Sequence, residues 1–166
     1  MLFALVFLAA VVADQLSKWW ILANFALYES REIIPGFFNF TLLTNNGAAF
    51  SILAGQPALW RQAFFVAINC IALVVIAIAQ RRIGRNDRLY TVALALIAGG
   101  AAGNLIDRLR FAYVVDFLDV YVGASHWPAF NIADAAINVG VALFLLNSLV
   151  LEPRKEKKVR MQTPSV

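Results

Sequence analysis

Two aspartates, Asp116 and Asp134, are the residues whose type and spacing best fit a chemical role in this chain. They lie 18 residues apart, at the edges of the last two hydrophobic stretches. A carboxylate at a membrane boundary is costly to hold, so it requires a partner, a water-filled pocket or a function. Two such residues on either side of one short segment suggest a pair that acts together.

A carboxylate pair can hydrolyse a peptide bond without a metal ion. One carboxylate acts as general base on a water molecule, and the other, protonated, donates a proton to the scissile carbonyl. Two close carboxylates share a proton because they do not easily ionise together. The chain has one cysteine, Cys70, and one histidine, His126, which disfavours a Cys/His metal site, Cys-His catalysis and a Ser-His-Asp triad. We therefore expect no metal and no cofactor.

The residues alone leave three classes of function open. A membrane hydrolase uses the two aspartates as acid and base, a transporter or proton-relay subunit uses them for coupling, and a structural protein uses them as internal contacts. The polar residues cluster toward one face of the membrane, and Asn69 is the only strongly polar residue of the second hydrophobic stretch. This distribution disfavours a continuous transport pathway.

The composition is that of a membrane protein. Of 166 residues, 61% are hydrophobic and 14% are charged, whereas a soluble domain is about half apolar and about a quarter charged. Four apolar stretches, at about residues 1–22, 63–79, 89–106 and 132–151, are each near the ~20 residues that cross ~30 Å of hydrocarbon. The sequence predicts an all-α polytopic membrane protein, with residues 1–166 as a single domain.

Basic residues predict the orientation in the membrane. Four arginines lie between the second and third stretches and five basic residues follow the fourth: Arg81, Arg82, Arg85 and Arg88, then Arg154, Lys155, Lys157, Lys158 and Arg160. The positive-inside rule makes both segments cytoplasmic, including the tail 152–166, and parity places the N-terminus there too. Segments 23–62 and 107–131 then face outward, with Asp116 and Asp134. We read the basic clusters as topology determinants and lipid contacts, with no nucleic-acid partner.

The outer segments carry further signals. Residues 33–44 favour a strand, residues 45–47 (NNG) indicate a turn, and residues 48–53 follow, so a small sheet or hairpin is expected at the membrane surface. Segment 107–131 is expected to be an outer loop or short helix. Asn131 is the expected N-cap of the fourth span, and Asn131, Asp134 and Asn138 share one helical face.

The end of the third span combines small and polar residues. The glycines and alanines of residues 99–103 predict close helix packing. Asn104 and Arg108 lie four residues apart and share a face. Arg108 is a candidate partner for Asp107, Asp14 or a ligand.

Five segments in this order resemble bacterial lipoprotein signal peptidase, also called signal peptidase II: residues 14–18 (DQLSK), 45–51 (NNGAAFS), 103–108 (GNLIDR), 114–117 (VVDF) and 127–134 (WPAFNIAD). The resemblance implies an aspartic endopeptidase of the bacterial cytoplasmic (inner) membrane. Such an enzyme removes the signal peptide from lipid-modified prolipoproteins, just before the lipid-modified cysteine. We expect prolipoproteins and membrane phospholipids as partners, and a monomer.

The resemblance also implies roles for individual residues. Asp116 and Asp134 correspond to the catalytic pair. Five residues correspond to substrate-site positions: Asn45, Gly47, Asn104, Arg108 and Asn131. Asp14 and Lys18 correspond to a pair on the first helix with a supporting or substrate-binding role. The segment from about Phe37 to Phe50 corresponds to a small extracytoplasmic sheet, a β-cradle, that holds the substrate.

Overall fold

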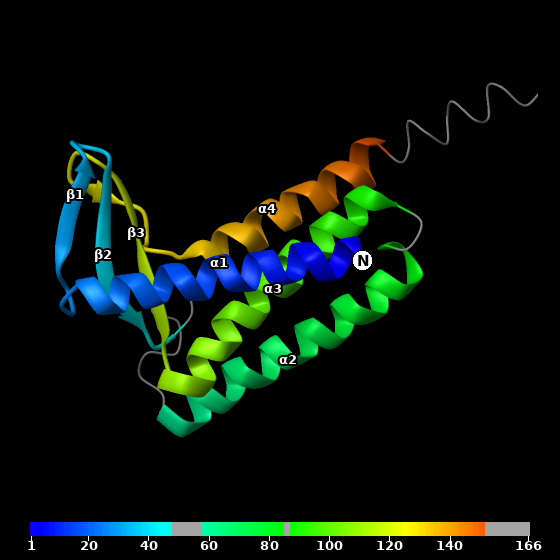
Figure 1. Ribbon diagram of the computed structural model, residues 1–166, viewed down its shortest axis with the longest axis horizontal. Coiled ribbons are helices and arrows are strands. Elements are labelled where there is room, and N and C mark those ends of the chain that lie inside the picture. Colours follow the sequence, from blue (N-terminus) through cyan, green and yellow to red (C-terminus); the bar gives the residue numbers. More distant parts are fainter. Residues whose placement is uncertain (48–57, 85–86, 152–166) are drawn as a thin grey trace, which may run out of the picture.

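The computed structural model describes residues 1–47, 58–84 and 87–151. Within these residues, four helices are long and apolar enough to cross a membrane (Figure 1). They are α1 (Leu2–Asn24), α2 (Ala58–Arg82), α3 (Arg88–Phe111) and α4 (Ile132–Leu146), and a π-helical turn, η3 (Asn147–Leu151), continues α4. The four predicted spans are thereby confirmed. The predicted segment 48–53, Arg85 and the tail 152–166 lie outside the described residues.

Two helices extend further than hydropathy predicted. Arg81 and Arg82 form the last turn of α2, and α3 continues through Arg108 and Arg110. Basic side chains in a last turn are favourable because they oppose the negative end of the helix dipole, so these residues lie in helix although they are not apolar. Arg108 and its neighbour Asp107 therefore lie on α3 and not in the outer loop that the sequence suggested.

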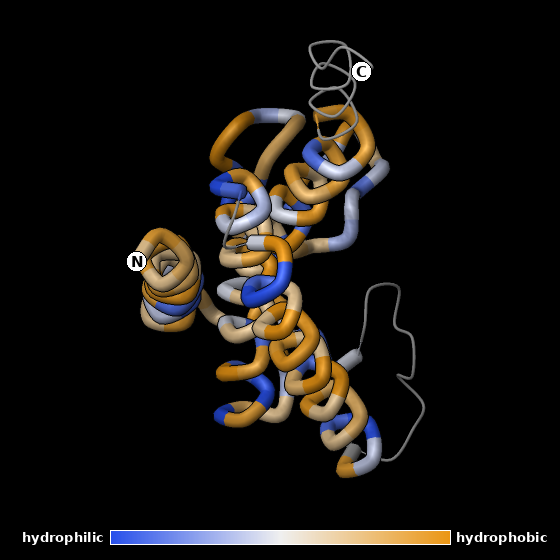
Figure 2. Tube along the Cα trace, turned by 90° about the vertical axis from the view of Figure 1, so that its right-hand side faces the viewer, coloured by the Kyte–Doolittle hydropathy of each residue, from blue (hydrophilic) through white to orange (hydrophobic). Residues whose placement is uncertain are grey.

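Helix α3 is the centre of the bundle and packs against each of the other three helices. Glycines allow this approach. A Cβ atom added to Gly99 would lie 2.7 Å from the Cβ of Ala10 on α1, and one added to Gly100 would clash with the carbonyl oxygen of Ala133 on α4. The prediction of close packing at residues 99–103 is confirmed. Hydrophobic residues predominate along the helices (Figure 2), most of those on α1 and α2 remain exposed, and few of those on α4 are buried.

A four-stranded antiparallel sheet lies at one end of the bundle (Figure 1). Its strands follow the order β1 (Ser30–Ile34), β2 (Phe38–Asn45), β3 (Val114–Val122) and β4 (Ser125–His126). The predicted small sheet is confirmed, but the strand-favouring run 33–44 is divided by a turn at Pro35-Gly36-Phe37. Gly36 has a φ of 73°, a conformation that glycine adopts without strain.

The expectation that segment 107–131 is a loop or short helix was wrong. Its centre forms β3, which pairs with β2 and places Leu43 opposite Asp116. The valines and aromatic residues of 114–122 favour a strand, and this preference outweighs the two aspartates within it. Ala112 ends α3 in the left-handed conformation (φ 64°) and turns the chain into β3. A cluster of Ile21, Phe25, Leu42, Val115 and Phe117 packs the end of α1 against the sheet.

Candidate active site

The structure brings Asp116 and Asp134 to one cavity of about 710 Å³. Asp116 lies in β3 and is 3% exposed, whereas Asp134 lies in the first turn of α4 and is half-buried. The cavity is lined by the end of β2, by Asn104 and Arg108 of α3, by residues 127–130, and by Asp134, Ile137 and Asn138 of α4. Two elements that are distant in the chain therefore present their carboxylates to the same space.

Asn131 connects the two aspartates. Its Nδ2 donates a 2.7 Å hydrogen bond to Oδ1 of Asp116, and its backbone N–H donates to Oδ2 of Asp134 at 3.3 Å. Its Oδ1 accepts from the backbone N–H of Asp134 at 2.9 Å, which completes a capping box at the start of α4. The prediction that Asn131 is the N-cap is confirmed. Asn131 is fully buried and outside the cavity lining, so in this structure it holds the aspartates in place from behind.

The second oxygen of each aspartate accepts a hydrogen bond from another amide. Asn45 Nδ2 donates to Oδ2 of Asp116 at 2.9 Å, and Asn104 Nδ2 donates to Oδ1 of Asp134 at 2.8 Å. Among the described residues, neither carboxylate forms an ion pair. Burial, and after it the charge of Asp134, raise the pKa of Asp116 to about 7, while the hydrogen bonds from Asn45 and Asn131 act in the opposite direction.

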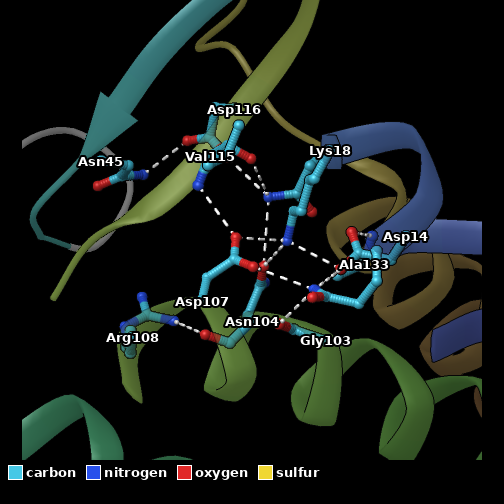
Figure 3. A network of polar contacts seen from close by, with 12 residues as sticks. Asp14, Lys18, Asn45, Gly103, Asn104, Asp107, Arg108, Val115, Asp116 and Ala133 are labelled. Atoms are coloured by element: carbon cyan, nitrogen blue, oxygen red, sulfur yellow. Dashed lines mark hydrogen bonds and ion pairs between the residues drawn. The ribbon is translucent and has the colours of Figure 1, made fainter. Parts of the chain in front are cut away.

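Lys18 organises a buried polar network behind the cavity (Figure 3). Its Nζ lies 2.9 Å from Asp14 Oδ2, 2.9 Å from Asp107 Oδ2 and 3.0 Å from Asn104 Oδ1. An ammonium group has three donors, and these contacts use all of them. Because Asn104 presents its oxygen to Lys18, its NH₂ group points to Asp134.

The two carboxylates beside Lys18 each hold a backbone segment next to the site. Asp107 Oδ2 accepts from the N–H of Val115, the residue before Asp116, at 3.1 Å. Asp14 Oδ1 accepts from the N–H of Ala133, the residue before Asp134, at 2.9 Å. Asp14 and Lys18 are almost completely buried and absent from the cavity lining, so the structure places them in a supporting position and not at a substrate-contacting surface.

Arg108 lies on the cavity wall. Asp14 and Asp107, its candidate partners from the sequence, pair with Lys18 instead. Its guanidinium donates to the carbonyl oxygens of Asn104 at 3.4 Å and Gly47 at 3.5 Å, and lies 5.0 Å from the ring centroid of Phe65. Within the described ranges it forms no ion pair, so the cavity has a cation available to a ligand.

Gly47 also lines the cavity, next to Arg108. Its backbone N–H donates to Asn45 Oδ1 at 3.0 Å, which turns the NH₂ group of Asn45 toward Asp116. The predicted site residues Asn45, Gly47, Asn104 and Arg108 all line the cavity with the two aspartates.

Sequence reasoning assigned no role to Gln15 and named Asp107 only as a candidate partner of Arg108. Gln15 Nε2 donates to Asp14 Oδ2 at 3.1 Å, Gly103 O at 3.2 Å and Asp107 Oδ1 at 3.0 Å, so it closes the network around Lys18. Both residues belong to segments that carry the family resemblance, and this was the one sequence signal that could have pointed to a role for them. Long-range hydrogen bonds of this kind have no local sequence pattern.

His126 has a different environment. Its Nδ1 lies 2.8 Å from Asp119 Oδ1, its ring stacks on Tyr121, and it is absent from the cavity lining. In the described part of the chain, no group of three His, Cys, Asp or Glu side chains is arranged to hold a metal ion.

The chain is similar to known proteins over most of its length. The family model of signal peptidase (SPase) II matches residues 6–150. A protein of Syntrophus aciditrophicus named lipoprotein signal peptidase is 47% identical over 149 residues, covering 89% of this chain and 90% of that protein. One of Shewanella woodyi with the same name is 51% identical over 138 residues, covering 83% of this chain and 77% of that protein.

Solved structures agree with the sequence comparisons. A bacterial membrane enzyme determined by the in meso method at 2.3 Å resolution superposes with a TM-score of 0.82 at 32% identity, over 99% of this chain and 94% of that one. A second, at 1.9 Å resolution, superposes with a TM-score of 0.79 at 35% identity, over 89% of this chain and 92% of that one. The chain therefore belongs to the signal peptidase II family, aspartic endopeptidases of the membrane that remove signal peptides from prolipoproteins.

Proposed function

We propose that Asp116 and Asp134 are the catalytic pair of this peptidase. The observation that supports the assignment is their joint position: both line one cavity, Asn131 hydrogen-bonds both, and neither is neutralised by an ion pair among the described residues. Carboxylates held by amide donors keep the ability to exchange protons, whereas carboxylates paired with a cation are held ionised. The raised pKa of Asp116 makes it the protonated partner near neutral pH.

The reaction then follows an acid–base cycle. Asp134 takes a proton from a water molecule as the water oxygen attacks the scissile carbonyl carbon, and Asp116 gives its proton to the carbonyl oxygen. The resulting tetrahedral diol loses a hydroxyl proton to Asp116 while Asp134 gives its proton to the amide nitrogen. The C–N bond breaks, and both aspartates return to their starting states.

The cavity walls supply the remaining contacts. Arg108, the end of β2 at Asn45 and the carbonyl of Gly47 surround the space beside the two aspartates, so in our proposal they hold the substrate backbone and the polar part of the lipid. The scissile bond is the one just before the lipid-modified cysteine. The acyl chains of that cysteine extend along the apolar helix surfaces into the bilayer, among the membrane phospholipids.

The proposed site lies at the outer boundary of the bacterial cytoplasmic membrane. Asp134 is in the first turn of a spanning helix, and the basic residues Arg81 and Arg82 end α2 at the other end of the bundle. The positive-inside rule then places both termini in the cytoplasm. One chain supplies every residue of the proposed site, so a monomer suffices for activity.

Cleavage by purified variants tests the catalytic pair. We expect Asp116→Asn and Asp134→Asn each to lower the cleavage rate of a lipid-modified precursor by at least about 1,000-fold, because each variant lacks one proton-transfer group. Asp119→Asn is the matched control: Asp119 lies on the same strand but bonds His126 and Asn39 outside the cavity, and this variant should retain activity. Near-normal cleavage by either of the first two variants would contradict the assignment.

A second arm tests the substrate class. The wild-type enzyme is incubated with the same precursor with and without its lipid modification. Cleavage of the modified form alone is the expected result. Equal cleavage of both forms would show that the enzyme does not recognise the lipid.

A further inference from the structure

Asn138 is a polar residue of the cavity to which no role has been assigned so far. It lies four residues after Asp134 on α4, so the two side chains share a helical face and are separated by about 6 Å along the axis. Both line the same cavity. Because Asp134 opens the helix, Asn138 lies one turn deeper in the span than the proposed catalytic pair.

The amide of Asn138 makes no hydrogen bond within the described residues. Three other asparagines at this site behave differently: Asn45, Asn104 and Asn131 each donate to an aspartate. Asn46, which is exposed, also lines the cavity. Asn69, in the middle of α2, donates to the carbonyl oxygen of Phe65 at 2.8 Å. Asn138 is exposed and lies on the cavity wall, so its amide is open to a ligand, and a polar group at membrane depth needs a hydrogen-bond partner.

The bound substrate has carbonyl oxygens at this depth. A peptide bond can enter a hydrolytic site only in an extended segment, whose backbone carbonyls have lost their helical partners and need new donors inside the membrane. The ester carbonyls of the lipid attached to the cysteine are acceptors of the same kind. Arg108 donates from α3 beside the aspartates, whereas the α4 wall beyond Asp134 presents Ile137 and Asn138.

We propose that Asn138 is a further substrate-binding residue, whose Nδ2 donates a hydrogen bond to a carbonyl oxygen of the bound prolipoprotein one helical turn below the scissile bond. The proposal rests on the catalytic assignment of Asp116 and Asp134. It predicts that the substrate continues along α4 from Asp134 toward the membrane centre. The acceptor is either a peptide carbonyl of the signal segment or an ester carbonyl of the lipid.

Steady-state kinetics on a lipid-modified precursor test the contact. We expect Asn138→Leu and Asn138→Ala each to raise KM about three- to tenfold with little change in kcat, which is the effect of losing one neutral hydrogen bond that is present in both ground and transition states. Asn69→Leu is the matched control, since it removes an asparagine from a spanning helix outside the cavity, and it should keep wild-type KM. The melting temperature of both Asn138 variants should not fall, because no intramolecular hydrogen bond is lost.

The source of the carbonyl is distinguished by a second substrate whose acyl esters are replaced by ether-linked chains. If the KM difference between wild type and Asn138→Leu disappears with the ether substrate, the acceptor is the lipid ester; if it persists, the acceptor is the peptide. Wild-type KM in both variants would overturn the proposal, as would a loss confined to leucine, which would indicate steric blocking. Failure of the catalytic assignment is seen separately, as activity in Asp116→Asn.

Discussion

At the scale of single residues, the site depends on the direction in which three amides point. Each asparagine oxygen is held by a donor: Gly47 N–H for Asn45, Lys18 for Asn104 and Asp134 N–H for Asn131. Their NH₂ groups are therefore turned toward the aspartates. Amide donors stabilise an ionised carboxylate less than a cation does, which leaves the pKa of Asp116 high enough for a proton to be present near pH 7.

The pKa of Asp116 predicts the alkaline limb of the pH–rate profile. Below about pH 7 the Asp116 carboxyl keeps its proton and can act as the acid, and above this value it has lost that proton. We therefore expect kcat/KM to fall as pH rises through about 7. The measurement is the initial cleavage rate at low substrate concentration over a range of pH in a constant-ionic-strength buffer.

A variant of Asn45 tests whether the alkaline limb of the pH–rate profile reports the pKa of Asp116. The hydrogen bond from Asn45 lowers the pKa of Asp116, so Asn45→Leu should move the limb to higher pH while it also weakens substrate binding. An alkaline limb at the same pH in this variant would show that another group controls it.

At the scale of elements, α3 supports both aspartates. Its Asn104 donates to Asp134 on α4, and its Asp107 accepts from the N–H of Val115 on β3. Its glycines allow α1 and α4 to approach. Gly100 faces the backbone of Ala133, the residue before Asp134. Any side chain at this position must move the first turn of α4.

Gly100→Ala should therefore reduce the cleavage rate by more than its loss of folding stability would explain. The added Cβ would clash with the carbonyl oxygen of Ala133 and lie 2.7 Å from Ile137 Cγ1, which displaces Asp134 relative to Asp116. We expect a loss of about 1–3 kcal/mol in stability and a fall of at least tenfold in kcat. Gly99→Ala is the control, because its Cβ would meet Ala10 and Phe7 on α1, away from the aspartates. Thermal unfolding in detergent and cleavage assays measure the two effects, and equal losses of kcat in both variants would contradict the explanation.

At the scale of the whole molecule, the two ends of the bundle differ in character. The sheet lies at one end, where its strands β2 and β3 carry Asn45 and Asp116 of the cavity, and the N-terminus, the end of α2 and the start of α3 lie at the other (Figure 1). This separation agrees with a single reactive face and a basic opposite face. By the positive-inside rule, the arginines at the second end predict that this end faces the cytoplasm.

Cysteine labelling in intact cells tests the orientation. In a Cys70→Ser background, Ser125→Cys lies on exposed β4 and Ile83→Cys lies after α2. A membrane-impermeant maleimide applied from the periplasmic side should label position 125, and it should label position 83 only after the membrane is permeabilised. The reverse pattern would show that the chain has the opposite orientation.

The sequence by itself determined the spans, the sheet beside them and the residues that approach the cavity. Hydropathy is a local property, so four apolar runs of suitable length identify four helices without knowledge of their packing. The helix N-cap at Asn131 was also readable, because the capping side chain and the N–H it binds are three residues apart. The resemblance supplied the candidate residues, and the catalytic and binding roles stay predictions.

Only the tertiary structure decided how these residues are connected. The pairing of β2 with β3 joins Asn45 to Asp116, 71 residues away, and the contact between Asp14 and Ala133 spans 119 residues. Lys18 forms ion pairs with both Asp14 and Asp107, so Arg108 pairs with neither of them and lies on the cavity wall. Hydrogen bonds between distant segments depend on how helices and strands pack, and packing leaves no periodic signal in the chain. The support behind the two aspartates was therefore visible only in the folded protein. Strand β3 is different: it was mistaken for a loop or short helix although its valines and aromatic residues favour a strand.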